Sequence, residues 1–553
     1  MNSAALAVHG LWRCCAAPST RRFVRAMKDP ERAQRRLLGG ILRRNEPTEF
    51  GRAHGFAKLK SAEDFQKSVP PRDYEDHKPW IDAAAAGKPG VLTPGRPLAF
   101  LPTSGTHSGA KLIPWTADLK REFNAALGPW VHGFMRSQPA AWRGSVYWSL
   151  SPPVWPEDRT SGGISIGFDS DASYLPALLQ PLLGAVFAVP SKVAGFRDPE
   201  VWRYATLLHL LGDGDLSMVS VWSPTFLTSL LEPLARWWPD LLKDLANGTF
   251  HPPNCNHEGT KPIRRSVRRA AELRGLSGAG GVPSYDSIWP RLAAISCWTD
   301  AAASEPSRRL ARLFPQARVV GKGLVATEGV VSIPWPEAGA PALALTSHFL
   351  EFVDDAGSIH PSWDLKESGC YSVLLTTGGG LYRYRLHDRI RVVGFHHRCP
   401  LVEFIGREGI TCDLCGEKLA EPFVRDCFDR VSRELGQVWE FALLAPSARG
   451  EGRGYAFFLS ESREAESGTI ARALDSALCG NVHYAHARRI GQLAPLEVVR
   501  IPGDGDWAWS RFQTSLAERG QRFGDIKPTA LDSRPGWELV FETGGRNPNI
   551  APK

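Results

Sequence analysis

Hydrophobic and polar positions change their spacing several times along this 553-residue chain. Residues 20–60 are polar with helical spacing, and Asp29-Pro30 is a helix-start signal. An apolar segment, 96–104, leads into a loop rich in glycine and hydroxyl side chains. Helical spacing resumes at Thr116, and either Thr116 or Asp118 can cap the helix that follows. The order apolar run, glycine-rich loop, helix suits anion binding at a helix N-terminus.

Short apolar runs alternate with helical segments through the next part of the chain. The alternation predicts an α/β sheet covered by helices on both faces. The predicted strands are 145–150, 218–222 and 292–298, and the predicted helices are 173–188, 198–211 and 225–246. Residues 251–284, rich in proline, glycine and arginine, predict an exposed excursion.

From residue 317 the predicted strands lie closer together, with few helices between them. Close spacing of this kind predicts an antiparallel subdomain or a small β-barrel. The strands are 317–320, 330–333, 371–376, 389–393 and 401–405. Beyond about residue 410 the pattern returns to α+β. The predicted fold class is therefore α/β, with a large N-terminal domain over residues 1–407 and a smaller α+β domain over 408–553.

Composition limits the function classes. The net charge of +8 is modest for this length, and basic runs such as Arg264–Arg269 are typical of solvated faces, so we expect no nucleic-acid partner. No apolar run reaches 18 residues and no secretory signal is evident, so we expect no membrane partner. Cys412 and Cys415 form a lone CxxC without the second pair that zinc needs. Scattered cysteines favour a cytoplasmic protein with reduced thiols.

The loop between Leu101 and Leu112 is the most informative segment. It reads Thr103-Ser104-Gly105-Thr106-His107-Ser108-Gly109-Ala110-Lys111. Glycines let successive N–H groups converge on an anion, and Lys111 can add a positive charge for a phosphate. The loop matches neither the Walker nor the Rossmann pattern. A plain surface loop is the alternative.

Two carboxylates follow in segments of their own. Glu328 lies in a turn between two predicted strands, where one carboxylate can hold Mg²⁺ that keeps its waters and substrate phosphates. The alternative is a turn glutamate without such a role. Asp388 opens a predicted strand after Tyr382-Arg383-Tyr384-Arg385, and its carboxylate can accept both hydroxyls of a ribose. An ion pair with a neighbouring arginine is the alternative.

Together these segments resemble the motif series of adenylate-forming enzymes, in the order T-S-G-T…K, T-E, Y-R-x-x-D and Gly406-Arg407-Glu408. The resemblance is closest to the auxin-responsive GH-three family of acyl acid amido synthetases, and covers roughly residues 25 to 535. Further marks are Thr48–Arg52, Leu112–Pro114, Ser220–Pro224, Ile295–Trp298, Arg391–Phe395, Gly416–Leu419 and Gly524–Pro528.

Three departures from the family pattern concern the same segments. His107 and Ser108 stand where a small residue and a glycine are common. The segment Val325–Glu328 lacks the tyrosine and the double serine of the plant pattern. His387 replaces the glycine of Y-R-x-G-D, and a bulky side chain there can narrow the ribose site.

The resemblance implies a role for each segment. Lys111 and Lys527 are the implied catalytic residues, and Glu328 holds Mg²⁺; a surface lysine is the alternative for Lys527. Apart from the resemblance, Trp222 and Trp298 follow predicted parallel strands, where an apolar acid can stack, and packing in the core is the alternative. Residues implied in nucleotide binding are Thr103, Ser104, Gly105, Thr106, Ser108, Gly109, Thr327, Asp388 and Arg407. The hinge to the C-terminal domain, which acts as a lid, is expected near Gly406–Gly409.

The implied function is that of an ATP-dependent ligase with ATP and Mg²⁺ as cofactors. It joins a small carboxylic acid to an amino acid through acyl-AMP, and we expect a cytoplasmic monomer. Two alternatives stay open: a thioester-forming ligase with the same first step, and a non-catalytic adenylate-fold protein that binds a ligand or partner. Retention of Lys111, Glu328 and Asp388 together favours an enzyme.

Overall fold

The structure is a computed structural model, and it describes most of the chain. The described residues are 3–103, 111–149, 159–167, 182, 184–196, 198–253, 265–277, 281–408, 411–415, 417–447, 453–461, 466–502, 504–519, 521, 523 and 526–542.

Helices open the chain, as the sequence predicts for its polar N-terminal part. The carboxylate of Asp29 accepts a hydrogen bond from the backbone N–H of Arg32, and Pro30 is the first residue of the second helix, so the predicted helix start is confirmed. The helices are α1 (Ser3–Lys28), α2 (Pro30–Asn45), α3 (Glu49–Ala53), α4 (Ala62–Ser68) and α5 (Tyr74–Ala85).

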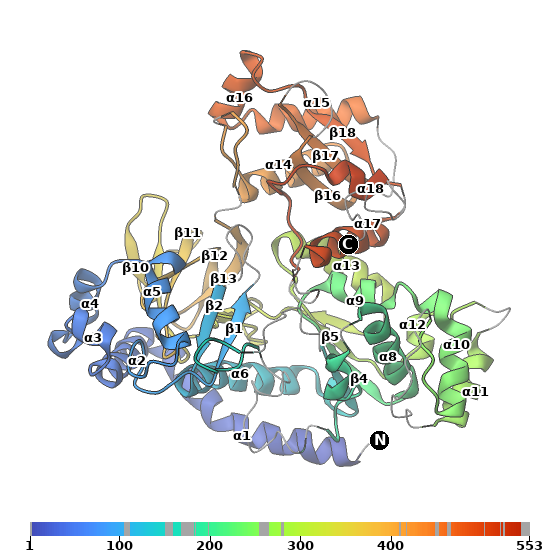
Figure 1. Ribbon diagram of the computed structural model, residues 1–553, viewed down its shortest axis with the longest axis horizontal. Helices are drawn as coiled ribbons and strands as arrows, with labels where there is room; N and C mark the ends of the chain where they lie inside the picture. The colour runs from blue at the N-terminus through green and yellow to red at the C-terminus, as the bar shows by residue number, and fades with distance from the viewer. Residues whose placement is uncertain are drawn as a thin grey trace. The chain divides into compact units, whose positions relative to one another are not determined.

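A hairpin and a long helix follow. Strands β1 (Ala99–Thr103) and β2 (Lys111–Trp115) are antiparallel, and their connecting loop lies outside the described residues. Helix α6 (Ala117–Ser137) begins directly after β2. The hydroxyl of Thr116 accepts the N–H of Leu119, so Thr116 is the cap. Figure 1 shows β1, β2 and α6 in blue and cyan.

The predicted α/β sheet is present as four parallel strands in the order β3-β4-β5-β6. The strands are β3 (Ser145–Trp148), β4 (Leu216–Ser220), β5 (Ala294–Ser296) and β6 (Arg318–Val320). The helices of this region are α8 (Pro199–Gly212), α9 (Pro224–Leu231), α10 (Leu234–Asn247), α11 (Val267–Leu276), α12 (Tyr285–Ile288) and α13 (Ser304–Leu313). Both α8 and α11 pack on α10 (Figure 1).

Three details of this region differ from the prediction. A helix was expected over 173–188, of which 173–181 and 183 lie outside the described residues. Near its end, Val186 and Ala188 instead form backbone hydrogen bonds with Val146 of β3. This pairing is possible because an apolar segment can pair with an unpaired strand edge. The expected helix 225–246 is two helices separated near Pro233, whose missing N–H breaks helical pairing. The expected excursion 251–284 contains α11, and Arg269 is buried there, donating to the carbonyls of Leu211 and Ile288.

The closely spaced strands form a seven-stranded sheet in the order β10-β9-β11-β12-β13-β8-β7, which confirms the antiparallel subdomain. The segment 317–320 was expected to belong to it but pairs with β5 as the last parallel strand. The seven strands are β7 (Ser332–Ile333), β8 (Ala342–Leu343), β9 (Phe349–Val353), β10 (Ile359–Pro361), β11 (Cys370–Thr376), β12 (Tyr384–His396) and β13 (Cys399–Arg407).

The chain divides into two compact units. The first comprises 1–222, 234–298 and 313–404, and the second comprises 223–233, 299–312 and 405–553. The second unit contains a three-stranded sheet, β16-β17-β18, with its own apolar core. Its elements after β13 are β14 (Thr411–Cys412), β15 (Leu419–Ala420), α14 (Glu421–Glu434), β16 (Trp439–Pro446), β17 (Tyr455–Glu461), α15 (Ser467–Leu478), α16 (Val482–Arg489), β18 (Glu497–Arg500), α17 (Gly505–Glu518) and α18 (Trp537–Glu542).

Within the described residues, no helix combines the length and the apolar character that a membrane span requires.

Candidate active site

The β1–β2 hairpin holds the predicted phosphate-binding lysine. Lys111 is the first residue of β2 and is the register partner of Thr103. Its ammonium lies 5.5 Å from the centre of the Tyr74 ring, and the Tyr74 hydroxyl accepts the backbone N–H of Leu112. The predicted loop residues between the strands lie outside the described residues: Ser104, Gly105, Thr106, His107, Ser108 and Gly109.

Glu328 lies in a tight turn, as the sequence predicts. Backbone N–H groups of Ala326 and Gly329 donate to each other's carbonyls at 3.0 and 3.2 Å, so Thr327 and Glu328 occupy the two turn positions. Glu328 is 5% exposed, and no residue within the described ranges donates a hydrogen bond to its carboxylate. A carboxylate oxygen without a protein donor fits a Mg²⁺ ligand, since Mg²⁺ uses one or two carboxylates and completes its shell with water and phosphate.

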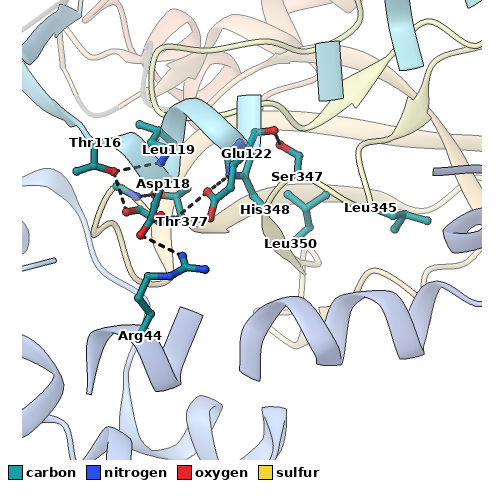
Figure 2. Close-up of polar contacts among 12 residues, drawn as sticks. Arg44, Thr116, Asp118, Leu119, Glu122, Leu345, Ser347, His348, Leu350 and Thr377 are labelled. Atoms are coloured by element: carbon teal, nitrogen blue, oxygen red, sulfur yellow. Dashed lines mark hydrogen bonds and ion pairs between the residues drawn. The ribbon is translucent and has the colours of Figure 1, made fainter. Parts of the chain in front are cut away.

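A buried polar network supports this turn, and the sequence did not reveal it. A Cβ on Gly329 would lie 2.9 Å from Nε2 of His348, so the turn can pack this closely only with glycine there. Nδ1 of His348 lies 2.9 Å from Oε2 of Glu122, which comes from α6 (Figure 2). The only sequence signal was a glutamate on the apolar stripe of α6, beside Leu119, Phe123 and Ala126.

Glu122 also fixes the glycine loop that precedes β12. Both of its carboxylate oxygens accept the backbone N–H of Gly378, at 2.9 and 2.8 Å. The hydroxyl of Thr116, the cap of α6, donates to the carbonyl of the same Gly378. The Glu122 carboxylate of α6 therefore contacts both the Gly378 loop and His348, whose ring packs against the Gly329 turn.

Asp388 lies inside β12 rather than at its start, because the strand begins at Tyr384. The register between β11 and β12 shifts here, so that residues 386–388 form a bulge. His387 takes a left-handed backbone conformation, with φ of 63°, where the family pattern has glycine. Its Nε2 lies 2.7 Å from Oδ1 of Asp73. Asp388 is buried, at 2% exposure.

The start of α5 connects the two predicted nucleotide-binding strands. Asp73 contacts His387 of β12, and the next residue, Tyr74, contacts Lys111 and Leu112 of β2. Lys111 and Asp388 thus lie on strands that both attach to consecutive residues of one helix start. This is the link that the described residues give between Lys111 and Asp388.

Arg383, which directly precedes the Y-R-x-x-D motif at Tyr384–Asp388, serves the scaffold. Its guanidinium donates to both carboxylate oxygens of Glu351, at 2.9 and 3.0 Å, and also to the carbonyls of Gln66 and Val69. Nearby, burial lowers the pKa of His77 to about 4, so its neutral Nε2 accepts the N–H of Tyr382.

The predicted acid-binding tryptophans lie together. The rings of Trp222 and Trp298 are 5.9 Å apart, and each residue follows a parallel strand. Beside Trp222 lies the buried ammonium of Lys322, which donates to Oγ of Ser220 at 2.7 Å. We missed Lys322 in the sequence, although a lysine between two glycines directly after a strand was a visible signal.

Arg407 and Lys527 belong to the second unit. Arg407 ends β13, and Lys527 is exposed in an extended segment after the buried Ile526. In the same unit Glu417 of the Gly416–Leu419 motif is buried and accepts the N–H groups of Leu414 and Cys415. Over the described part of the chain, no cluster of three or more His, Cys, Asp or Glu side chains is arranged to hold a metal.

Residues 19–319 match the GH3 family N-terminal domain, 342–407 the central domain, and 424–534 the C-terminal domain. The chain belongs to the GH3 family. Its fold is that of the adenylate-forming enzymes, with a large N-terminal part and a smaller C-terminal part.

Several similar proteins are plant enzymes. The chain is 24% identical to a probable indole-3-acetic acid-amido synthetase of Oryza sativa, with 86% of this chain and 87% of that protein covered. It is 23% identical to a jasmonoyl–L-amino acid synthetase of the same plant, over 88% and 90%. The solved structure of the GH3.15 acyl acid amido synthetase with 2,4-DB superposes with a TM-score of 0.80, 17% identity and coverage of 95% and 96%.

Proposed function

We propose that this chain is an ATP-dependent acyl acid–amido synthetase. The supporting observation is the linkage inside the first unit. Glu122 contacts the Gly378 loop and His348, whose ring packs against the Gly329 turn, and β12 and β2 both attach to the start of α5. Family membership over all three domains supports the same activity.

The reaction needs ATP because an ionised carboxylate does not react with an amine in water. A carboxylate oxygen attacks the α-phosphorus, a new P–O bond forms, and pyrophosphate leaves with the electrons of the broken P–O bond. The amine of an amino acid then attacks the acyl carbon, and AMP leaves after the amine has lost a proton. Catalysis of the first step is mostly positioning and charge neutralisation.

Each predicted residue has a task in that scheme. Lys111 and the loop from Thr103 hold the phosphates, and Asp388 accepts the ribose hydroxyls, with Thr327 and Arg407 as further nucleotide ligands. Glu328 holds Mg²⁺, which supplies positive charge to the phosphates when bound. Lys527 neutralises charge at the α-phosphate.

We further propose that residues 408–553 move as a lid. Gly406 supports a hinge at this position, because its φ of 144° is a conformation that other residues rarely adopt. The second proposed hinge glycine, Gly409, lies outside the described residues. Closure would bring Lys527 to the nucleotide for adenylation. A cytoplasmic, monomeric protein is part of the same proposal.

The test is ATP–pyrophosphate exchange across a panel of carboxylic acids, followed by product analysis with amino acids or with CoA as acceptor. Acid-dependent exchange and an amide product are expected, in line with the amide-forming relatives. Exchange followed by product only with CoA would assign a thioester-forming ligase. No exchange with any acid would favour the non-catalytic alternative.

A further inference from the structure

The parallel sheet carries an aromatic cluster at the carboxyl ends of its strands. Trp148 ends β3, and the residues two positions beyond the ends of β4, β5 and β6 are Trp222, Trp298 and Lys322. The last strand residues Trp148, Ser220, Ser296 and Val320 are register partners in one row across the sheet. Because strand side chains alternate between faces, the positions two residues on continue the same face. We call Trp130, Trp148, Trp222, Trp298 and Lys322 the edge cluster.

Lys322 is the charged member of the edge cluster. It is 4% exposed, and its ammonium lies 5.1, 5.6 and 5.1 Å from the ring centres of Trp130, Trp148 and Trp222. Ring faces attract a cation, and a desolvated cation acts on an anion more strongly than one in water. Burying an ammonium costs free energy, because the charged group loses its water. An apolar side chain at this position would stabilise the fold more, if the position served packing alone.

A second observation points to a ligand at the same place. Ser296 is fully buried, and its hydroxyl has no hydrogen-bond partner within the residues that the structure describes. It is the register neighbour of Ser220, whose hydroxyl receives the Lys322 ammonium. Nearly all buried polar groups in proteins are hydrogen-bonded. A donor hydroxyl next to an ammonium fits an acceptor oxygen of a bound molecule.

We propose that Lys322 and Ser296 bind the carboxylate of the acyl acid, and that the rings of Trp148, Trp222 and Trp298 hold a flat aromatic body. These three rings are partly exposed, whereas the Lys322 ammonium is buried. One carboxylate oxygen is held by the ammonium and the hydroxyl, and the other attacks phosphorus. The substrate class is therefore planar aromatic acids. This inference rests on the proposed function, because that function supplies the acid.

The test separates binding of the carboxylate from stacking of the ring. ATP–pyrophosphate exchange with indole-3-acetate and phenylacetate gives KM for each acid, and the matched primary amides serve as competitive inhibitors with the same ring but no charge. Lys322→Met should raise KM for the acid about 10- to 150-fold, the range for one charge-assisted hydrogen bond, and leave KM for ATP unchanged. It should raise Ki for the amide by a smaller factor, because the neutral amide oxygen accepts a weaker hydrogen bond. Ser296→Ala should raise KM for the acid less.

Two further variants serve as controls. Trp298→Leu should raise KM for the acid and Ki for the amide by the same factor, because both molecules stack. Lys78→Met removes an exposed lysine that pairs with Asp82, and should change neither constant.

Three results would overturn the inference while leaving the proposed function intact. The first is an unchanged KM for the acid in Lys322→Met. The second is an equal rise in KM for the acid and Ki for the amide in the same variant, which would give Lys322 a structural role. The third is that the wild-type protein catalyses exchange with aliphatic acids only. No exchange with any acid would remove the proposed function itself, and this inference with it.

Discussion

Two buried cations in the first unit, Arg383 and Lys322, have very different surroundings. Arg383 lies in the antiparallel sheet, and its guanidinium donates to a buried carboxylate and to two backbone carbonyls. Lys322 lies at the edge of the parallel sheet among indole rings, with the Ser220 hydroxyl as a neighbour. A cation paired with a protein carboxylate contributes to the scaffold, whereas a cation among ring faces can act on an incoming anion.

The same contrast separates other parts of the two sheets. In the antiparallel sheet, the buried carboxylate of Glu351 pairs with Arg383, and beside that sheet Glu122 of α6 contacts both His348 and Gly378. At the carboxyl edge of the parallel sheet, Ser296 has a buried hydroxyl with no partner in the described part of the chain. The contacts of Glu122 thus support the Glu328 turn and the Gly378 loop, and the proposed acid site lies at the carboxyl end of the parallel strands.

The largest effect is expected from breaking the Arg383–Glu351 pair. Arg383→Met should lower the free energy of unfolding by about 3–5 kcal/mol, because it leaves a buried carboxylate without its partner. Urea denaturation measures the loss. Arg391→Met, which breaks the exposed pair with Glu403, is the control and should cost less than about 1 kcal/mol. Equal losses in both variants would remove the distinction between scaffold and surface cations.

His77 should make the same scaffold sensitive to acid. Burial lowers its folded-state pKa to about 4 from 6.5, so the unfolded chain binds the proton more tightly. The free energy of unfolding therefore has its full value above pH 6.5, and it falls by about 3 kcal/mol as the pH is lowered toward 4 and His77 takes up a proton. Denaturation of the wild type and His77→Gln at several pH values measures the difference. A slope that is identical in both proteins would contradict this assignment.

Lys111→Ala should reduce activity without unfolding the first unit. Loss of one charge-assisted contact to phosphate costs about 1.5–3 kcal/mol, or about 10- to 150-fold in exchange rate. Asp388→Ala should have a similar effect through the ribose. Thermal melting checks that the fold is retained. Wild-type exchange in both variants would contradict the nucleotide-site assignment and leave these residues to the scaffold.

The smallest effect is expected at the contact between Gly329 of the turn and the ring of His348. In Gly329→Ala, the new Cβ must push the His348 ring away, so about 1–3 kcal/mol of stability and part of the exchange activity should be lost. Gly40→Ala is the control, since open space surrounds that position in α2, and alanine should stabilise the helix by about 0.5–1 kcal/mol. If Gly329→Ala were as harmless, the Glu122–His348 network would not support the turn.

The sequence by itself determined the local elements and the types of chemistry. Thr116 and Asp29-Pro30 predicted helix starts because caps act within one turn, and alternating apolar runs predicted parallel strands because both faces of such a sheet are buried. The order of motifs indicated the family, and Glu328 was predicted in its turn.

Only the tertiary structure decided how those groups are partnered. The partner of Arg383 is 32 positions away, and Glu122 meets His348 across 226 positions, so no local pattern can pair them. Lys322 was overlooked for the same reason: its neighbours Trp130, Trp148 and Trp222 come from α6, β3 and the end of β4. Spacing along a chain encodes which face a side chain takes, while the charge it meets depends on which strands the fold brings together.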